Sequence, residues 1–386
     1  MLEKALVGGR KYWIWMACLL AVMVVGFIMW LWQLSYGLGI TGMSRDVSWG
    51  VYIANFTFLV GVAAAAVMVV TPYYIHHYKV FGRITILAEF LGVSAVTMCL
   101  LFIIADLGNP FRALNVLIHP TPNSILFWDM VVLNGYLFLN IFVGWNVLTA
   151  ERKGTAPPRW IKPFIYVSIP WAVSIHTVTA FLYAGLPGRH FWLTAIMAAR
   201  FLASAFAAGP ALLIIFCLIV RKNTKFDPGN EPIRTLSGIV TYAMCLNVFF
   251  FLLEVFTGFY SNIPGHMHTI QYLFAGLHGH NALVPWMWTA TFFAAASLVL
   301  LLVPATRRTD DTLVVACICV FIATWIDKGV GLVLGGFVPN PLHHITEYRA
   351  TVPEILITLA IWATGFFILS ALYKVAITVK EEQQQA

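Results

Sequence analysis

The sequence predicts an all-α polytopic membrane protein with about ten transmembrane helices, and three observations support this fold class. Of its 386 residues, 60% are apolar and only 10% are charged, a balance that excludes a water-soluble domain of this length. The apolar residues gather in ten long segments, and about 20 such residues suffice to cross a membrane as a helix. The basic residues between the segments lie mostly on one predicted side of the membrane.

Short loops join the ten predicted helices, and no segment has the composition of a soluble domain. The helices are expected at approximately residues 12–36, 49–75, 82–106, 125–149, 162–185, 191–220, 235–260, 281–303, 312–335 and 353–379. The first follows three basic residues, yet it is longer than the apolar core of a signal peptide and lacks a small-residue cleavage site. We therefore expect it to be retained.

The distribution of charge predicts the orientation. With the N-terminus in the cytoplasm, seventeen Lys and Arg residues face the cytoplasm and only four face outward: Arg45, Arg112, Arg189 and Arg349. This positive-inside bias places both termini in the cytoplasm, which requires an even number of spans. It also explains the net charge of +7 without a nucleic-acid partner. We expect a multi-pass protein of the cytoplasmic membrane.

A weak internal repeat, 143–148 residues apart, predicts two related halves. Trp49 begins the second helix as Trp192 begins the sixth, and Phe102–Asp106 matches Phe250–Glu254. We expect two four-helix bundles, made by the second to fifth helices and by the sixth to ninth, with the first and last helices flanking them. The expected units are residues 1–48, 49–190, 191–340 and 341–386. Chance similarity among apolar helices is the alternative.

The segment 105–129, which links the third and fourth helices outside the membrane, concentrates ionisable side chains. Asp106 closes one helix, Arg112 can neutralise it, His119 follows, and Asp129 enters the next helix. A helix end neutralised by a nearby arginine accounts for Asp106 and Arg112, but it leaves His119 and Asp129 unexplained. We therefore expect proton-handling chemistry at this edge of the membrane.

Three motifs in the second to fourth helices carry a resemblance to a known family. They read Trp49-Gly50-x4-Asn55-x2-Phe58-Leu59-Val60-Gly61-x2-Ala64, then Ala105-Asp106-Leu107-Gly108-x-Pro110-x-Arg112, then Pro120-x3-Ser124. The motifs resemble the NrfD/PsrC family, the quinone-reactive membrane subunits of respiratory oxidoreductases. The ten-helix length is similar to the branch found in alternative complex III and in the Dsr- and Hmc-type complexes of sulfate reducers, the Dsr type most closely. Two residues depart from the family pattern: Arg200 inside the sixth helix, and His119 where Asn is usual.

The resemblance implies menaquinone as the bound quinone and a respiratory complex as the context. It also implies an external ferredoxin-like iron–sulfur subunit, a multihaem cytochrome and further membrane subunits as partners. We expect no haem, iron–sulfur cluster or metal in this chain. Only His176 of the eleven histidines lies inside the membrane, and the six cysteines form no Cys-x-x-Cys pair. The external histidines between Pro264 and His280 predict a docking surface for a redox subunit rather than a zinc site.

A lipid-borne quinone suits such a bundle, because its ring and tail need an apolar pocket with a few polar groups. Oxidising a quinol also requires bases that accept two protons. We expect Asp106, Arg112 and His119 to act in catalysis. We expect the quinone to be bound by Asn55, Asp129 and Tyr136. The simpler alternatives are an interhelical hydrogen bond for Asn55 and ordinary packing for Tyr136.

Other ionisable residues are expected at membrane depth, where a charge is costly and therefore a candidate for function. We expect a proton pathway through Glu89, His176, Arg200 and Glu254. The alternative for Arg200 is a structural ion pair with Glu254 or Asp106. Asp327 and Lys328 are adjacent, and we expect them to neutralise each other locally.

The expected function is oxidation or reduction of menaquinol near the external face, with electrons exchanged with the iron–sulfur partner and with or without proton translocation. The chain would then be the quinol-reactive subunit of a multi-subunit oxidoreductase and not a catalyst by itself. Two rivals stand beside this prediction. One is a secondary transporter, whose site would lie at broken helices near the membrane midplane. The other is a structural membrane anchor without a quinone site.

Overall fold

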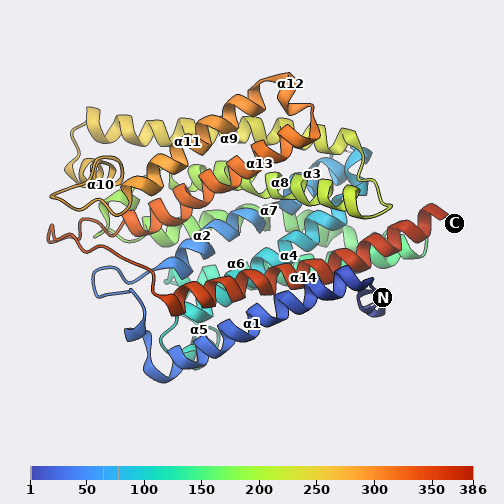
Figure 1. Cartoon of the computed structure of the whole chain (residues 1–386), viewed down its shortest axis with the longest axis horizontal. Coiled ribbons are helices and arrows are strands. Elements are labelled where there is room, and N and C mark those ends of the chain that lie inside the picture. Colours follow the sequence, from blue (N-terminus) through green and yellow to red (C-terminus); the bar gives the residue numbers. More distant parts are fainter. Residues whose placement is uncertain (1, 64, 77, 386) are drawn as a thin grey trace.

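The computed structural model describes residues 2–63, 65–76 and 78–385, and these form long helices that run side by side (Figure 1). Both termini lie at the same end of the bundle, whereas α5 (Asn115–Ile118) and α10 (Pro264–Phe274) lie at the other end. An even number of membrane crossings produces this arrangement.

Within the described residues, ten helices are long and apolar enough to cross a membrane, which confirms the predicted fold class. The spans are α1 (Arg10–Tyr36), α2 (Val51–Ala63) with α3 (Ala65–Tyr74), α4 (Thr85–Asp106), α6 (Ile125–Arg152), α7 (Lys162–Ala184), α8 (Met197–Asn223), α9 (Asn230–Tyr260), α11 (Val284–Leu302), α13 (Asp310–Thr324) with η7 (Trp325–Leu334), and α14 (Val352–Gln385). The short helices are η1 (Leu2–Leu6), η2 (Leu38–Ile40), η3 (Lys79–Arg83), η4 (Pro110–Arg112), η5 (Arg159–Ile161), η6 (His190–Trp192) and α12 (Pro304–Arg307), besides α5 and α10.

The span formed by α2 and α3 lies at the centre of the bundle and packs against α4, α7, α8 and η7. Small residues allow this close approach. A Cβ atom added at Gly209 of α8 would lie 2.8 Å from the backbone nitrogen of Ala65, and one at Gly61 would lie 3.4 Å from the Cα of Ala205. The backbones of α8 and the central span therefore touch with no side chains between them.

The first and last spans pack together at one edge of the molecule (Figure 1), and α14 also packs on α4. A Cβ atom at Gly26 of α1 would lie 2.1 Å from the Cβ of Ala360 in α14. On the opposite side, α11 packs on α13 and α9 packs on α8. The division of the chain at residues 48, 190 and 340 stays a prediction.

The ninth span changes its winding in its second half, where α13 continues as the π-helix η7. π-helical turns are rare and occur mostly at functional sites. Here the turn contains Asp327 and Lys328, and it packs on α2. It therefore brings two charged residues to the contact with the central span.

Candidate functional site

The ends of α1, α2, α4 and α14 that face away from the termini hold a cluster of polar side chains around Asp106. Gln33 of α1 donates a hydrogen bond of 2.7 Å to the carbonyl of Ala105, and Tyr52 of α2 donates one of 2.8 Å to Gln33 Oε1. Asp106 Oδ1 is buried and has no hydrogen-bond partner in the described part of the chain. Leaving a buried carboxylate oxygen without a hydrogen-bond partner costs about 1–3 kcal/mol or more of folding free energy. Its presence in the fold therefore points to a functional role.

Glu354 of α14 lies close enough to Asp106 for their charges to interact, but its surroundings differ. Glu354 is fully buried and accepts hydrogen bonds from Tyr348 Oη at 2.7 Å and from the backbone nitrogens of Gly42 and Thr351 at 2.8 Å each. These donors match the ionised, acceptor-only form of a carboxylate. Of the two acids, Asp106 is therefore the one with an oxygen left to exchange a proton.

Asp129 of α6 is buried next to α7 and shares a neighbour, Tyr183, with Asp106. Asp129 Oδ1 accepts a hydrogen bond of 2.7 Å from Thr179 of α7. Tyr183, which sequence reasoning did not single out, is fully buried, is hydrogen-bonded to Thr57 of α2 and lies within range of the charges of both acids.

Arg112 and His119 lie apart from this cluster. Both are exposed in the loop between α4 and α6, and Arg112 forms no ion pair with Asp106 among the described residues. The expected neutralisation of Asp106 by Arg112 is therefore wrong for this structure. The reason is geometric: α4 ends at Asp106, the chain is extended at Leu107, and η4 then carries Arg112 on the outer surface.

Asn55 of α2 serves as an interhelical hydrogen-bond centre. Its Oδ1 accepts from Trp325 Nε1 of η7 at 3.1 Å and from Trp362 Nε1 of α14 at 2.9 Å, and its Nδ2 donates to the carbonyl of Val51 at 2.8 Å. This is the simpler alternative that the sequence offered for Asn55. A ligand that donates a hydrogen bond to Asn55 Oδ1 would have to displace one of the two indole groups, whereas the second N–H of the amide has no acceptor among the described residues.

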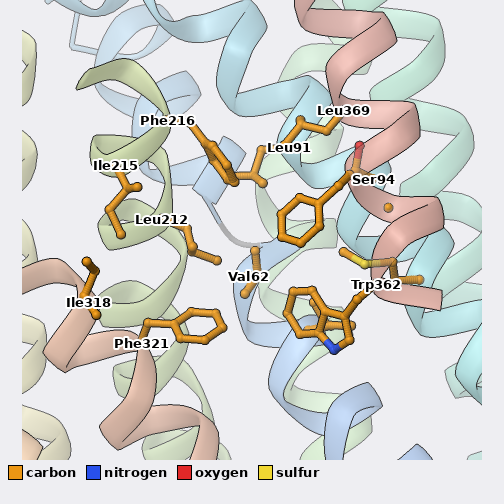
Figure 2. Close-up of a pocket in the computed structure, with 14 residues that line it drawn as sticks. Val62, Leu91, Ser94, Leu212, Ile215, Phe216, Ile318, Phe321, Trp362 and Leu369 are labelled. Carbon is orange, nitrogen blue, oxygen red and sulfur yellow. The ribbon is translucent and has the colours of Figure 1, made fainter. Parts of the chain in front are cut away.

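An apolar cavity of about 200 Å³ lies beside Trp362, between α2, α4, α8, α13 and α14. Phe216, Phe321 and Trp362 surround it, and the side chains of Val62 and Leu212 extend into the same space (Figure 2). A second cavity, of about 180 Å³, lies between α1, α4 and α14 and includes Ala105, the neighbour of Asp106. Its lining is almost entirely apolar, as a site for a hydrocarbon chain or ring requires.

Tyr136 lies seven residues beyond Asp129 on α6, which is about 10 Å along the helix. Its hydroxyl donates to the carbonyl of Ala63 at 3.4 Å, and it lines a very small cavity with Glu89 and Asn140. The structure therefore groups Tyr136 with Glu89 and separates it from the Asp106 cluster. Both carboxylate oxygens of Glu89 are buried without a hydrogen-bond partner in the described residues.

The other buried charges form two groups at the contact of η7 with its neighbours. Arg200 of α8 binds Glu254 of α9 and, at 2.7 Å, Asp327 Oδ1. The ion pair between Arg200 and Glu254 is the structural alternative that the sequence offered for Arg200. Asp327 forms its ion pair with Arg200 and not with the adjacent Lys328, although the charge of Asp327 still acts on Lys328.

Lys328 instead reaches across the core to α8. Its Nζ lies 3.5 Å from the backbone carbonyl oxygen of Phe201 and 4.2 Å from the centre of the Phe201 ring. Its charge also acts on His176 of α7, whose two ring nitrogens are buried without a hydrogen-bond partner in the part of the chain described.

The predicted external docking segment forms α10, which is folded back on α9. His266 is half-buried there, and burial together with the neighbouring His190 lowers the pKa of His266 from its ordinary value of 6.5. Among the described residues, no three His, Cys, Asp or Glu side chains are grouped to hold a metal ion.

Sequence reasoning missed Gln33 and Glu354 because it treated the first and last helices as flanking elements. It missed Tyr52 and Tyr348 because the sequence does not show which side chain a tyrosine hydroxyl meets. One signal was available. Gln33 and Glu354 are polar residues inside or at the start of otherwise apolar segments, and such residues usually face the interior of a bundle.

The fold and the site together define a class: a polytopic helical membrane protein with partly unpaired acids beside apolar cavities. Residues 39–333 match the family described as polysulphide reductase, NrfD, and this chain belongs to that family. The chain is 24% identical to a protein of Halobacterium salinarum named as a dimethyl sulfoxide reductase membrane subunit, over 95% of this chain and 86% of that protein.

Two further relatives carry the names of quinone-linked membrane subunits. The Hdr-like menaquinol oxidoreductase integral membrane subunit of Archaeoglobus fulgidus is 24% identical over 68% of this chain and 64% of that protein. The menaquinone reductase, integral membrane subunit, of Nitratidesulfovibrio vulgaris is 20% identical over 94% of this chain and 91% of that protein. The relatives come from several kinds of reductase, so membership of the Dsr-type branch stays an expectation.

Proposed function

We propose that this chain is the menaquinol-reactive membrane subunit of a respiratory oxidoreductase. Its quinone site lies at the outer end of α4, against Asp106. The observation that carries the proposal is the buried, unpartnered Oδ1 of Asp106 beside the Tyr52–Gln33 pair and next to an apolar cavity. The names of the menaquinol- and menaquinone-linked relatives supply the class of substrate.

The cavity between α1, α4 and α14 would receive part of the quinone from the membrane, since its lining is apolar and it adjoins Ala105. Oxidation of menaquinol releases two electrons and two protons and leaves menaquinone. Asp106 would accept one proton, and Asp129 with Tyr183 is the nearest further route for the second. Tyr52 and Gln33 would hold the end of α4 in place, and Asn55 would shape the site through its two tryptophans.

Electrons must leave through a partner, because we assign no redox centre to this chain. We propose an external ferredoxin-like iron–sulfur subunit, with a multihaem cytochrome and further membrane subunits in the complex. The loop that carries Arg112 and His119 supports this placement. Its apolar residues Phe111, Leu114 and Ile118 are exposed, Phe111 by 84%, which is the composition of a surface that another subunit covers. Arg112 and His119 would then act at that interface.

Glu89, His176, Arg200 and Glu254 are proposed to carry protons through the bundle. Glu89 and His176 support this role best, because their polar atoms are buried and unpartnered in the described structure. Arg200 and Glu254 are engaged with each other and with Asp327, so they would act as one group with a shared charge. The termini would face the cytoplasm, and the Asp106 cluster would face outward.

The Asp106→Asn variant, purified with its native subunits, tests the site. We expect menaquinol oxidation to fall by about 100-fold or more, the usual scale for loss of a general base, with unchanged assembly. The matched control is Asp311→Asn, an exposed acid at the opposite end of the bundle, which should retain full activity. Full activity in an assembled Asp106→Asn complex would exclude Asp106 from the mechanism. That outcome is what a purely structural anchor predicts.

A further inference from the structure

A separate cavity, of about 220 Å³, lies between α9, α11 and the end of α13 with η7. It is similar in size to the cavity of Figure 2, so size does not distinguish the two, but its lining does. The cavity of Figure 2 is lined almost wholly by apolar side chains. The cavity beside α9 and α11 also contains the amide of Asn247 and the carboxylate of Asp327. The proposed quinone site uses neither residue.

Asn247 is the first sign of a ligand. Its side chain is 4% exposed, its Oδ1 is buried, and it makes no side-chain hydrogen bond to any described residue. Five other asparagines in the spans behave differently: each donates a hydrogen bond from Nδ2 to the carbonyl four residues earlier. They are Asn55, Asn134, Asn140, Asn146 and Asn223. A buried amide without this bond destabilises the folded protein unless a ligand in the cavity forms a hydrogen bond with it.

Asp327 is the second sign. Arg200 binds its Oδ1 at 2.7 Å, and its side chain is 16% exposed where it lines the cavity. Its Oδ2 receives no hydrogen bond from the residues that the structure describes. Since Arg200 also binds Glu254, the single positive charge of its guanidinium is shared between two carboxylates. The cavity therefore presents an acceptor that suits a hydroxyl donor.

The walls suit a flat ring. The rings of Phe251 and Phe274 lie 5.8 Å apart at one side, and Met287 lies in the wall as well. On α11 the wall is made of alanines, among them Ala290 and Ala294, which leave room where larger residues would fill the space. Leu252, also in the lining, is 57% exposed on the surface of the bundle. A ligand can therefore enter from the hydrocarbon of the membrane.

We propose that this cavity binds a second molecule of the quinol class. Its ring lies between Phe251 and the alanines of α11, one ring oxygen bonds to the amide of Asn247, and one hydroxyl donates to Asp327 Oδ2. The proposal rests on the proposed function only for the class of ligand. A lipid acyl chain would fill the apolar part, but it would leave the Asn247 amide unpaired.

Photolabelling of the complete complex in nanodiscs, with an azido-naphthoquinol, tests this second site. We expect labelled peptides from α9 or α11 in addition to those near Asp106, and competition of both by unlabelled short-chain menaquinol. Asn247→Leu removes the amide without a buried hydrogen bond to lose, so the variant should fold at least as well as the parent. It should reduce labelling of α9 and α11 by about tenfold, as the loss of about 1.4 kcal/mol implies.

Ala294→Phe, which fills the cavity from α11, should abolish the same label. The control Asn146→Leu, on a half-buried position of α6 away from both sites, should change neither label. Unchanged labelling of α9 and α11 in Asn247→Leu would overturn the second site. Labelling there that phospholipid displaces and menaquinol does not would also overturn it in favour of a lipid site. Loss of the label near Asp106 alone would count against the proposed function and leave the second site standing.

Discussion

The hydroxyl of Tyr52 donates a hydrogen bond of 2.8 Å to Gln33, and the same glutamine donates at 2.7 Å to the carbonyl of Ala105. Residues of the first and second spans thus hold the end of α4 one residue before Asp106. Both side chains are almost fully buried. The position of Asp106 therefore depends on two residues that do not touch it through a hydrogen bond.

Tyr52→Phe removes this link and keeps the ring. We expect the protein to lose about 1 kcal/mol of stability and menaquinol oxidation to slow by about tenfold, through kcat rather than KM. Steady-state kinetics of the purified complex provides the measurement. Tyr242→Phe is the control, because Tyr242 is 76% exposed on α9 and should tolerate the change. An unchanged kcat in Tyr52→Phe would mean that the link is only structural.

Asn55 joins three spans, and Asn55→Leu leaves the indole N–H groups of Trp325 and Trp362 without their acceptor. Each unpaired buried donor costs about 1–3 kcal/mol, so we expect a loss of roughly 2–5 kcal/mol. Thermal unfolding followed by tryptophan fluorescence measures it. Asn146→Leu, which loses only a bond to its own helix, should unfold within a few degrees of the parent. Equal melting of the two variants would contradict the bridging role.

The sequence predicted the helices well, because ten apolar segments are a local property that periodicity and length reveal. It also indicated Asp106, Asp129 and Arg200 as candidate functional residues, because a charged residue within an apolar segment is recognisable from the sequence alone. It offered Glu254 as a partner for Arg200, but it could not predict the neighbours of Asp106. Glu354 reaches Asp106 from the last span, and nothing in the spacing indicates that α14 packs on α4. Adjacency in sequence was a poor guide to contacts. Asp327 pairs with Arg200, whereas Lys328 lies against the carbonyl of Phe201, because neighbouring residues on a helical turn point in different directions.

Among the described residues, Glu254 and Asp327 form ion pairs with Arg200 and with no other basic side chain. Arg200→Met would leave the buried Glu254 and the partly buried Asp327 without their ion-pair partner, and breaking a buried ion pair in this way costs about 3–5 kcal/mol. We expect the variant to assemble poorly. Adding Glu254→Leu to Arg200→Met should recover part of that loss, since it removes one uncompensated acid. Yield and melting temperature of the single and double variants measure this, and a double variant less stable than the single one would contradict it.

Gly209 lets α8 touch the central span. Its added methyl group would lie 2.8 Å from the backbone nitrogen of Ala65 and 3.1 Å from the carbonyl of Val62, so the backbones must separate. Gly209→Ala should therefore destabilise the protein by about 1–3 kcal/mol. The control is Gly238→Ala in α9, where a Cβ meets nothing within 4 Å. That variant should be neutral or more stable by up to about 1 kcal/mol, because alanine favours the helix. Opposite signs for the two glycines in one unfolding assay are the expected result.

The partial burial of His266 in α10 predicts how the stability of the protein changes with pH. Burial lowers its pKa in the folded protein, so the unfolded chain binds a proton first as pH falls. The unfolded state then gains protons that the folded state lacks, and stability falls below the ordinary histidine pKa of 6.5. We expect the melting temperature to drop between about pH 7.5 and about pH 5.5. His266→Gln should show a smaller drop, while His343→Gln, an exposed histidine, should follow the parent. A parent and a His266→Gln variant with the same pH dependence would show that His266 does not titrate on unfolding.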